Sequence, residues 1–252
     1  MNAIPLIVCG MGRSGTRTVA DILSAHERIQ LYGEIPPQMI DAFMTFLDKV
    51  DLGYFKNPQF TEDWKARKLN YLYESFNALS KTYAKKTKDS LLVCGYKSPR
   101  HEMHFKKLEK HFNNADASAH YIYCTRSAET CWASYKSMPW NSFTLETFLE
   151  DYKQSLREYH VMKEAASERV HVFSLDAYTR APDRYEYFKT RFLVPLGIEE
   201  NERVRATIES NLNRNATVNV TKQNRKALLS EEVEAIQKDP DLPALLAGVA
   251  GV

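Results

Sequence analysis

The sequence of 252 residues lacks any apolar run long enough to cross a membrane as a helix, which takes about 20 residues. Its net charge is only +2, so overall charge gives no attraction to nucleic acid or to an anionic membrane, and any anion site must be local. The first residues, MNAIPLIVC, carry no basic segment, and we interpret them as a core strand rather than a signal peptide. These absences predict a cytoplasmic protein that binds neither nucleic acid nor membrane.

Cysteine is also scarce, with four residues that show no metal-type spacing. Three of the four lie inside apolar runs, which favours small, buried, reduced thiols over disulfides. His101 and His104 have a spacing that permits a metal pair, but no third ligand stands out near them. We therefore expect no metal site.

Apolar runs that predict buried strands occur four times, at residues 4–9, 90–96, 120–125 and 169–175. Each run is followed by a segment with helical character, and this alternation predicts an α/β fold with a central parallel β-sheet flanked by helices. The hydrophobic fraction of 44% is that of an ordinary globular protein, and the chain shows no internal repeat or domain boundary. We expect a single domain over residues 1–252.

Helical patterns accompany these strands. An aromatic and leucine stripe from residue 61 to residue 86 predicts a helix that packs on the sheet. The Asn-rich stretch at 211–223 predicts an extended loop. Ser230 is predicted to be a helix N-cap, because three of the four residues after it are acidic. The other predicted helices cover residues 16–25, 145–167 and 182–196, the last ending at a turn at Gly197.

The stretch IVCGMGRSGTRTVADIL, residues 7–23, predicts a P-loop-like strand–loop–helix. Its glycines let the backbone turn sharply with N–H groups facing inward, and the helix N-terminus adds partial positive charge. Arginine and hydroxyl side chains supply further donors to a phosphate. The predicted phosphate-binding residues of this loop are Gly12, Arg13, Ser14, Gly15, Thr16, Arg17 and Thr18.

The loop departs from the pattern of ATP- and GTP-binding loops. Four residues separate Gly10 from Gly15, as in that pattern, but the next residue is Thr16 where the pattern has lysine. Of the predicted strand ends only Leu175-Asp176 is acidic, so no apolar strand ends in an obvious Mg²⁺ ligand. An arginine-based loop suits a terminal 5′-phosphate better than a metal-bridged triphosphate. A nucleotide or small-molecule kinase remains the alternative.

Two further basic residues, Lys97 and Arg126, follow predicted strands. Lys97 comes directly after the strand at 90–96, where residues of a parallel sheet line the ligand crevice. Arg126 follows the strand at 120–125, and Ser134 lies eight residues later, roughly two helical turns along the next helix. Arg126 and Ser134 are therefore candidates to bracket a second phosphate.

Taken together, these residues resemble the sulfotransferases that use 3′-phosphoadenosine-5′-phosphosulfate (PAPS). GRSGTRTVADILSAHERIQLYGE is similar to the 5′-phosphosulfate loop and first helix of the tyrosylprotein and bacterial branches. GYKSPRHEMHF resembles a Gly-x-Lys-x-Pro segment of the same branches, and CTRSAETCWASY resembles the 3′-phosphate motif. VHVFSLDAYTRAPDRYEYFKTRFLVPLGI is similar to the late strand, helix and turn of the family, so the resemblance covers most of residues 4–198.

The resemblance implies a role for each of these residues. Arg13 and the loop would hold the 5′-phosphate of PAPS or of its product PAP, and Arg126 with Ser134 would hold the 3′-phosphate. Lys97 would stabilise the leaving oxygen, and Glu34 would be the catalytic base, with His101 and His104 as alternatives. Lys222 and Arg225 would replace a basic signature that the classical cytosolic branch has near its C-terminus.

The resulting hypothesis is metal-independent transfer of a sulfuryl group from PAPS to a hydroxyl or amine of a small-molecule or sugar acceptor. We expect the loops at 35–60 and 137–145 to form the acceptor site. A non-catalytic nucleotide-binding protein is a second alternative beside the kinase. The sequence predicts neither the acceptor nor the oligomeric state.

Overall fold

The computed structural model describes residues 3–54, 58–79, 91–113, 118–210 and 226–249. Its centre is a five-stranded sheet in which every pairing is parallel and the strand order is β2-β3-β1-β4-β5. The strands are β1 (Ile4–Gly10), β2 (Ile29–Tyr32), β3 (Val93–Lys97), β4 (His120–Thr125) and β5 (Val170–Ser174). The predicted parallel α/β sheet is confirmed, with β2 as a strand that the sequence analysis missed.

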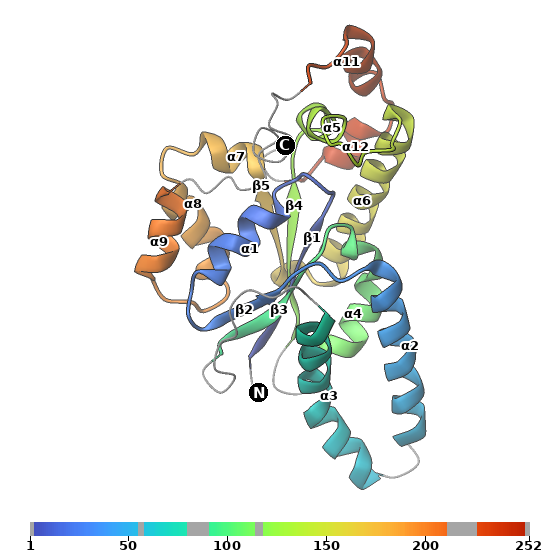
Figure 1. Ribbon diagram of the computed structural model, residues 1–252, viewed down its shortest axis with the longest axis vertical. Helices are drawn as coiled ribbons and strands as arrows, with labels where there is room; N and C mark the ends of the chain where they lie inside the picture. Colours follow the sequence, from blue (N-terminus) through green and yellow to red (C-terminus); the bar gives the residue numbers. More distant parts are fainter. Residues whose placement is uncertain (1–2, 55–57, 80–90, 114–117, 211–225, 250–252) are drawn as a thin grey trace.

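One face of the sheet is covered by α1 and by helices of the later chain (Figure 1). Leu6 and Val8 of β1 point to this face and belong to a buried cluster with residues of these helices. The elements are α1 (Thr16–Ser24), α7 (Leu175–Arg180), α8 (Arg184–Phe188), the π-helical turn η4 (Lys189–Leu193) and α9 (Glu202–Glu209). The predicted helix at 182–196 is thus α8 with η4, and the turn at Gly197 has the left-handed φ of +64°.

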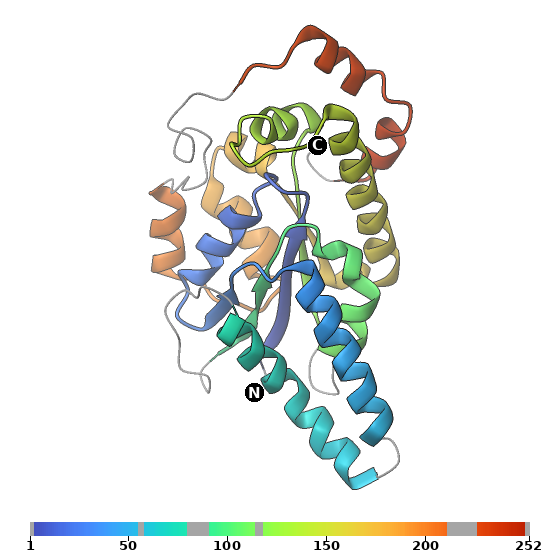
Figure 2. The same ribbon diagram turned by 45° about the vertical axis from the view of Figure 1, so that its right-hand side comes forward.

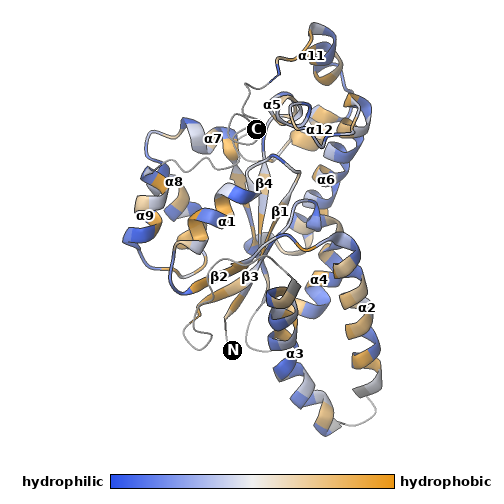
Figure 3. Cartoon of the chain, in the orientation of Figure 1, coloured by the Kyte–Doolittle hydropathy of each residue, from blue (hydrophilic) through white to orange (hydrophobic). Residues whose placement is uncertain are grey.

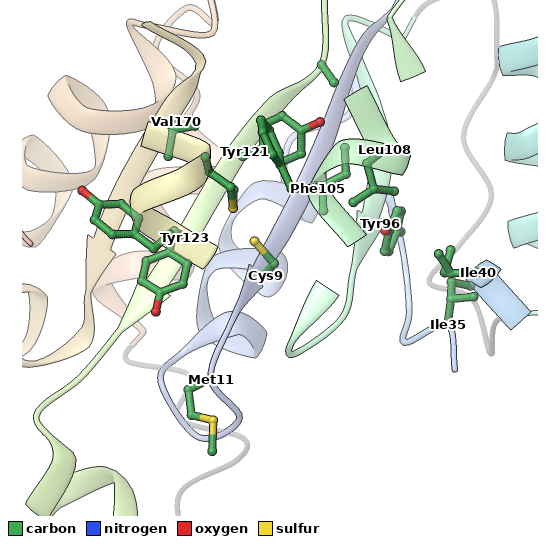
Figure 4. Packing of buried hydrophobic residues seen from close by; sticks show 14 of the residues in the cluster. Cys9, Met11, Ile35, Ile40, Tyr96, Phe105, Leu108, Tyr121, Tyr123 and Val170 are labelled. Carbon is green, nitrogen blue, oxygen red and sulfur yellow. The ribbon is translucent and has the colours of Figure 1, made fainter. Parts of the chain in front are cut away.

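The other face carries the larger core, in which Ile7 and Cys9 of β1 alternate with the residues of the first face. Figure 4 shows this packing, with Cys9, Tyr96, Tyr121 and Phe105 beside one another between sheet and helices. The covering elements are α2 (Pro37–Tyr54), α3 (Pro58–Leu79), α4 (Phe105–Phe112), α5 (Ala128–Tyr135), α6 (Leu145–Ala165) and α12 (Leu242–Leu246). Burial of β1 on both faces explains its uninterrupted apolar sequence.

Helices α2 and α3 form a hairpin that extends away from the sheet (Figures 1 and 2). The prediction of a loop at 35–60 is therefore wrong for most of that segment. Pro37 is the first residue of α2, a position where its missing N–H costs nothing. The predicted aromatic stripe is helical in α3, and its Leu69, Leu72 and Phe76 are buried in the core.

Two 3₁₀ turns and a further helix complete the described chain: η2 (His101–His104), η3 (Ser167–Arg169) and α11 (Ser230–Gln237). The helix N-cap predicted at Ser230 lies one residue earlier in the structure. Leu229 is the N-cap of α11, and Ser230 is its first residue. The N–H of Leu229 donates to the carboxylate of Glu232 at 2.7 Å. The loop predicted at 211–223 lies outside the described residues.

Hydropathy follows the layers, with hydrophobic colour on β2 and β3 and both colours on the surrounding helices (Figure 3). All four cysteines are buried, as predicted, and none of the four forms a disulfide. Among the residues that the structure describes, no helix combines the length and apolar character needed to cross a membrane.

Candidate functional site

The residues predicted to bind phosphates lie at one edge of the sheet, at the carboxyl ends of its central strands. β1 is the middle strand, and its register places Val8 beside Lys97 of β3 and Gly10 beside Cys124 of β4. The loop after β1 therefore lies between the end of β3, which is Lys97, and the end of β4, which precedes Arg126. In Figure 1 this edge lies where α1 and α5 begin.

The loop makes its turn at glycines that no other residue could replace without movement. Gly10 has φ of +116°, and a Cβ there would lie 2.1 Å from the carbonyl oxygen of Cys124. A Cβ on Gly12 would lie 2.1 Å from the hydroxyl of Tyr135 on α5. Arg13 adopts φ of +64°, an uncommon value for a residue with a side chain. Such backbone conformations persist where the surrounding structure fixes them, and they cluster at binding sites.

The surrounding structure fixes this loop through its carbonyl groups. All four carbonyl oxygens from Gly10 to Arg13 accept a hydrogen bond. Their donors are, in order, the N–H of Arg100 (2.8 Å), Oγ of Ser14 (2.5 Å), Sγ of Cys131 (3.2 Å) and Nη1 of Arg126 (3.5 Å). Because a trans peptide places its C=O and N–H on opposite sides, the N–H groups of Gly12 and Arg13 point away from these donors.

The loop leads directly into α1, whose N-terminal residues are Thr16, Arg17 and Thr18. Gly15 occupies the N-cap position with a left-handed conformation, and it has no side chain to cap this end. An uncapped N-terminus presents backbone N–H groups and partial positive charge, which suits an anion. Thr16 is buried and Thr18 is half-buried. The side chain of Arg17 pairs with Asp21 one helical turn on, at 2.8 Å.

Arg13, Arg126 and Ser134 come together although they are far apart in sequence. Nε of Arg13 donates to Oγ of Ser134 at 3.0 Å, and Nη1 of Arg126 contacts the carbonyl of Arg13. Partial burial lowers the pKa of Arg13 below its ordinary value, but a guanidinium keeps its charge at neutral pH. The two arginines and the buried hydroxyl of Ser134 thus form one cationic cluster beside the loop.

Asp176 holds Arg126 in place. Its carboxylate accepts from Nε of Arg126 at 3.3 Å and from the N–H of Ser127 at 2.9 Å. The sequence analysis considered this residue only as a possible metal ligand, whereas the structure places it against an arginine. Among the described residues no group of three or more His, Cys, Asp and Glu side chains is arranged to hold a metal ion.

Lys97 and Glu34 are also brought together, with Nζ of Lys97 donating to Oε1 of Glu34. The lysine side chain is only 4% exposed, whereas that of Glu34 is 62% exposed. Ser98, which follows Lys97, ties the end of β3 to β1 and to the segment that carries Glu34. Its N–H donates to the carbonyl of Val8, and its hydroxyl donates to the carbonyl of Ile35. A buried ammonium therefore lies next to a carboxylate that faces solvent.

The two histidines proposed as alternative bases make contacts with groups other than this pair. His101 is fully buried, and its Nδ1 lies 3.0 Å from the hydroxyl of Tyr96. Burial lowers the pKa of His101 to about 3. His104 lies on the same turn, with its Nδ1 3.4 Å from a carboxylate oxygen of Asp41. Lys222 and Arg225 lie outside the described residues.

Comparison with known proteins decides the family. A family model described as "Sulfotransferase family" matches residues 5–183, which is most of the chain and includes every described residue of this site.

The chain belongs to the sulfotransferase family.

Solved structures of sulfotransferases share the fold of this family member at low sequence identity. Sulfotransferase STF9 from Mycobacterium avium superposes with a TM-score of 0.54 and 16% identity, covering 98% of this chain and 77% of that one. The sulfotransferase domain of the olefin synthase from Synechococcus PCC 7002 gives a TM-score of 0.51 and 14% identity, covering 94% of both chains. Mouse sulfotransferase SULT7A1, solved in complex with PAP, gives 0.51 and 12%, covering 98% of this chain and 88% of that one.

No curated protein matches this sulfotransferase sequence. The predicted family and fold are both confirmed, since the family model and the structural neighbours agree. The sequence analysis missed four residues that shape the site: Glu102, Cys131, Tyr135 and Asp176. All four lie in segments that resemble the family, but their contacts join segments far apart in the chain, so spacing along the sequence does not reveal them.

Proposed function

We propose that this sulfotransferase transfers a sulfuryl group from PAPS to a hydroxyl or amine of a small-molecule or sugar acceptor. The observation that carries the proposal is the joined cluster of Arg13, Arg126 and Ser134 beside the loop. One phosphate at the loop and α1 N-terminus and a second at Arg126 would match a 3′,5′-bisphosphate. The structural neighbour SULT7A1 was solved with PAP, which supports this assignment.

PAPS would supply the sulfuryl group and leave as the bisphosphate. In the proposed reaction Glu34 accepts the proton of the acceptor while the acceptor oxygen or nitrogen forms its bond to sulfur. The bond between sulfur and the bridging phosphate oxygen breaks, and Lys97 stabilises the electron pair that this oxygen retains. Because Nζ of Lys97 and Oε1 of Glu34 are in contact, both groups can act on one reacting centre.

The proposal includes no metal in the transfer step. The transferred sulfuryl group carries one negative charge where a phosphoryl group carries two, so cationic side chains can stabilise it. Arg13 and Lys97 supply these charges from neighbouring segments, the loop after β1 and the end of β3. Such fixed charges act mainly on the transition state, because they require no reorganisation as charge develops.

The test is calorimetric titration of adenosine 3′,5′-bisphosphate in EDTA, with ADP and Mg²⁺ in a parallel titration. Tight binding of the bisphosphate without metal supports the proposed donor. ADP binding that requires Mg²⁺, without bisphosphate binding, would instead support a kinase. Transfer of label from ³⁵S-PAPS to a panel of phenols, alcohols, amines and sugars then identifies the acceptor class. Bisphosphate binding without transfer to any acceptor would favour a nucleotide-binding protein.

A further inference from the structure

A carboxyl group is buried directly behind the phosphate loop. Glu102 lies in η2 and is 1% exposed, and burial raises its pKa above the ordinary value. Its Oε2 accepts the N–H of Gly10 at 2.8 Å, across 92 residues of sequence. Its Oε1 accepts the hydroxyl of Ser155 on α6 at 2.5 Å. A buried carboxyl is costly unless its oxygens find donors, and here both have one.

The contact falls at the point where β1 becomes the loop. Gly10 is the last residue of β1, and its left-handed φ starts the turn. The same turn that carries Glu102 also supplies the N–H of Arg100 to the carbonyl of Gly10 at 2.8 Å. Both polar groups of Gly10 are therefore bonded to one segment, 100–102. The direction in which the chain leaves the strand is fixed by that segment.

Glu102 is itself held by neighbours on both sides. Ser155 is fully buried, and its Oγ lies 3.0 Å from the hydroxyl of Tyr123 on β4. The network thus links α6, η2, β4 and the start of the loop. Glu102 lies beneath the loop in the interior, and its hydrogen bond to the loop runs through the N–H of Gly10.

We propose that Glu102 is a positioning residue for the phosphate loop, which sets the N–H groups of residues 12–16 for the 5′-phosphate. This inference rests on the proposed function, because it assigns the loop to a 5′-phosphate. Removal of Glu102 leaves the N–H of Gly10 buried without an acceptor, and the loop then relaxes to satisfy it. Affinity for the 5′-phosphate falls because the bound arrangement is no longer preorganised.

The test compares two ligands in Glu102→Met and Glu102→Gln by calorimetry. Adenosine 3′,5′-bisphosphate uses the loop, whereas adenosine 3′-monophosphate lacks the 5′-phosphate. Met retains the length of the side chain without an acceptor, so we expect about tenfold weaker binding of the bisphosphate. Binding of the monophosphate should change by less than about twofold. Gln retains an oxygen for Gly10 and should bind both ligands as the wild type does.

Glu109→Gln provides a matched control. Glu109 also accepts several hydrogen bonds, from Tyr121 and Arg169, but it lies on α4 away from the loop. This variant should lose stability without a change in the ratio of the two affinities. If Glu102→Met does not fold, Glu102→Asp provides the same test, because its shorter side chain withdraws the carboxylate from Gly10.

Two results would overturn the inference: equal weakening of both ligands in the Met or Asp variant, or unchanged bisphosphate binding in a folded variant. Equal weakening would indicate a general structural role. Failure of the proposed function is a separate result, because wild-type protein would then not bind the bisphosphate in EDTA at all.

Discussion

Nε of Arg13 donates a hydrogen bond to Oγ of Ser134 at 3.0 Å, which joins the loop after β1 to helix α5. The proposed contact groups for the two phosphates of PAPS are thus in contact with each other. The position of the side chains that contact one phosphate therefore depends in part on the side chains that contact the other.

Replacement of Arg126 by Gln should weaken adenosine 3′,5′-bisphosphate binding by about 10- to 100-fold, the usual effect of losing a charged hydrogen bond. Adenosine 5′-monophosphate, which lacks the 3′-phosphate, should lose less than about threefold. Calorimetry measures both. Arg157→Gln on α6 removes the same charge from an exposed position and should change neither. Equal losses for the two ligands would contradict the assignment of Arg126 to the 3′-phosphate.

Replacement of Glu34 by Gln should lower kcat by about 10²- to 10⁴-fold, the usual contribution of a general base. Bisphosphate affinity should remain within about twofold of wild type, because Glu34 lies beside Lys97 and not in the loop. Steady-state kinetics and calorimetry provide the two readouts. Glu62→Gln, another exposed glutamate paired with a lysine, is the control and should leave kcat unchanged. A wild-type kcat in Glu34→Gln would place the base elsewhere.

Replacement of Gly12 by Ala should destabilise the protein by about 1–3 kcal/mol, the usual cost of overpacking. The added Cβ would lie 2.1 Å from the hydroxyl oxygen of Tyr135 and 2.9 Å from its Cζ. Tyr135→Phe removes the nearer atom, so the double variant should recover part of the loss but not all. Urea unfolding of the four proteins in this cycle gives the coupling free energy. A coupling of zero would show that the loop accommodates the methyl group by moving elsewhere.

Stability should fall as the pH drops from about 6.5 towards 4, in part because of a histidine pair. Nδ1 of His120 and Nε2 of His171 are 3.1 Å apart on neighbouring strands. Burial is the main cause that lowers both pKa values, that of His171 to about 4, and the positive charges of Arg169 and Lys163 add to it. The unfolded chain therefore binds more protons than the folded chain in this range, so acid favours unfolding.

The measurement is the urea midpoint at pH 7.5, 6 and 5 for wild type and His171→Gln. The variant should show a shallower decline with falling pH. The difference between the two proteins is the readout, because burial also lowers the pKa of His101 and His111. Parallel declines would exclude the pair as a contributor.

The sequence was most informative where one residue follows a buried strand. Lys97 and Arg126 could be placed at the same edge of the sheet because the strands before them are apolar and parallel strands end together. β2 was missed because it is only four residues long and includes the polar Gln30, although all four residues are buried. The segment at 35–60 was predicted as a loop, whereas in the structure Pro37 begins α2.

Contacts between distant segments could not be predicted in this way. His101 was an alternative base because histidines often serve as bases, but the η2 turn directs it into the core against Tyr96. Glu102, its neighbour, is buried behind the loop, and nothing in the local sequence indicates this. Asp176 pairs with Arg126 only because β4 and β5 are adjacent. Neither periodicity nor spacing carries such information.

The hydrogen bonds of the loop carbonyls determine whether the proposed phosphate-binding motif can adopt its conformation outside this protein. Of the four donors that hold them, only Ser14 belongs to the loop itself, while Arg100, Cys131 and Arg126 come from later segments. A fragment of residues 4–24 would contain the motif but not the groups that shape it. If these residues alone were grafted into another strand–helix unit, the motif sequence would be present, but the loop would not adopt its conformation. A relative with a degenerate motif can retain the site if it keeps these distant donors.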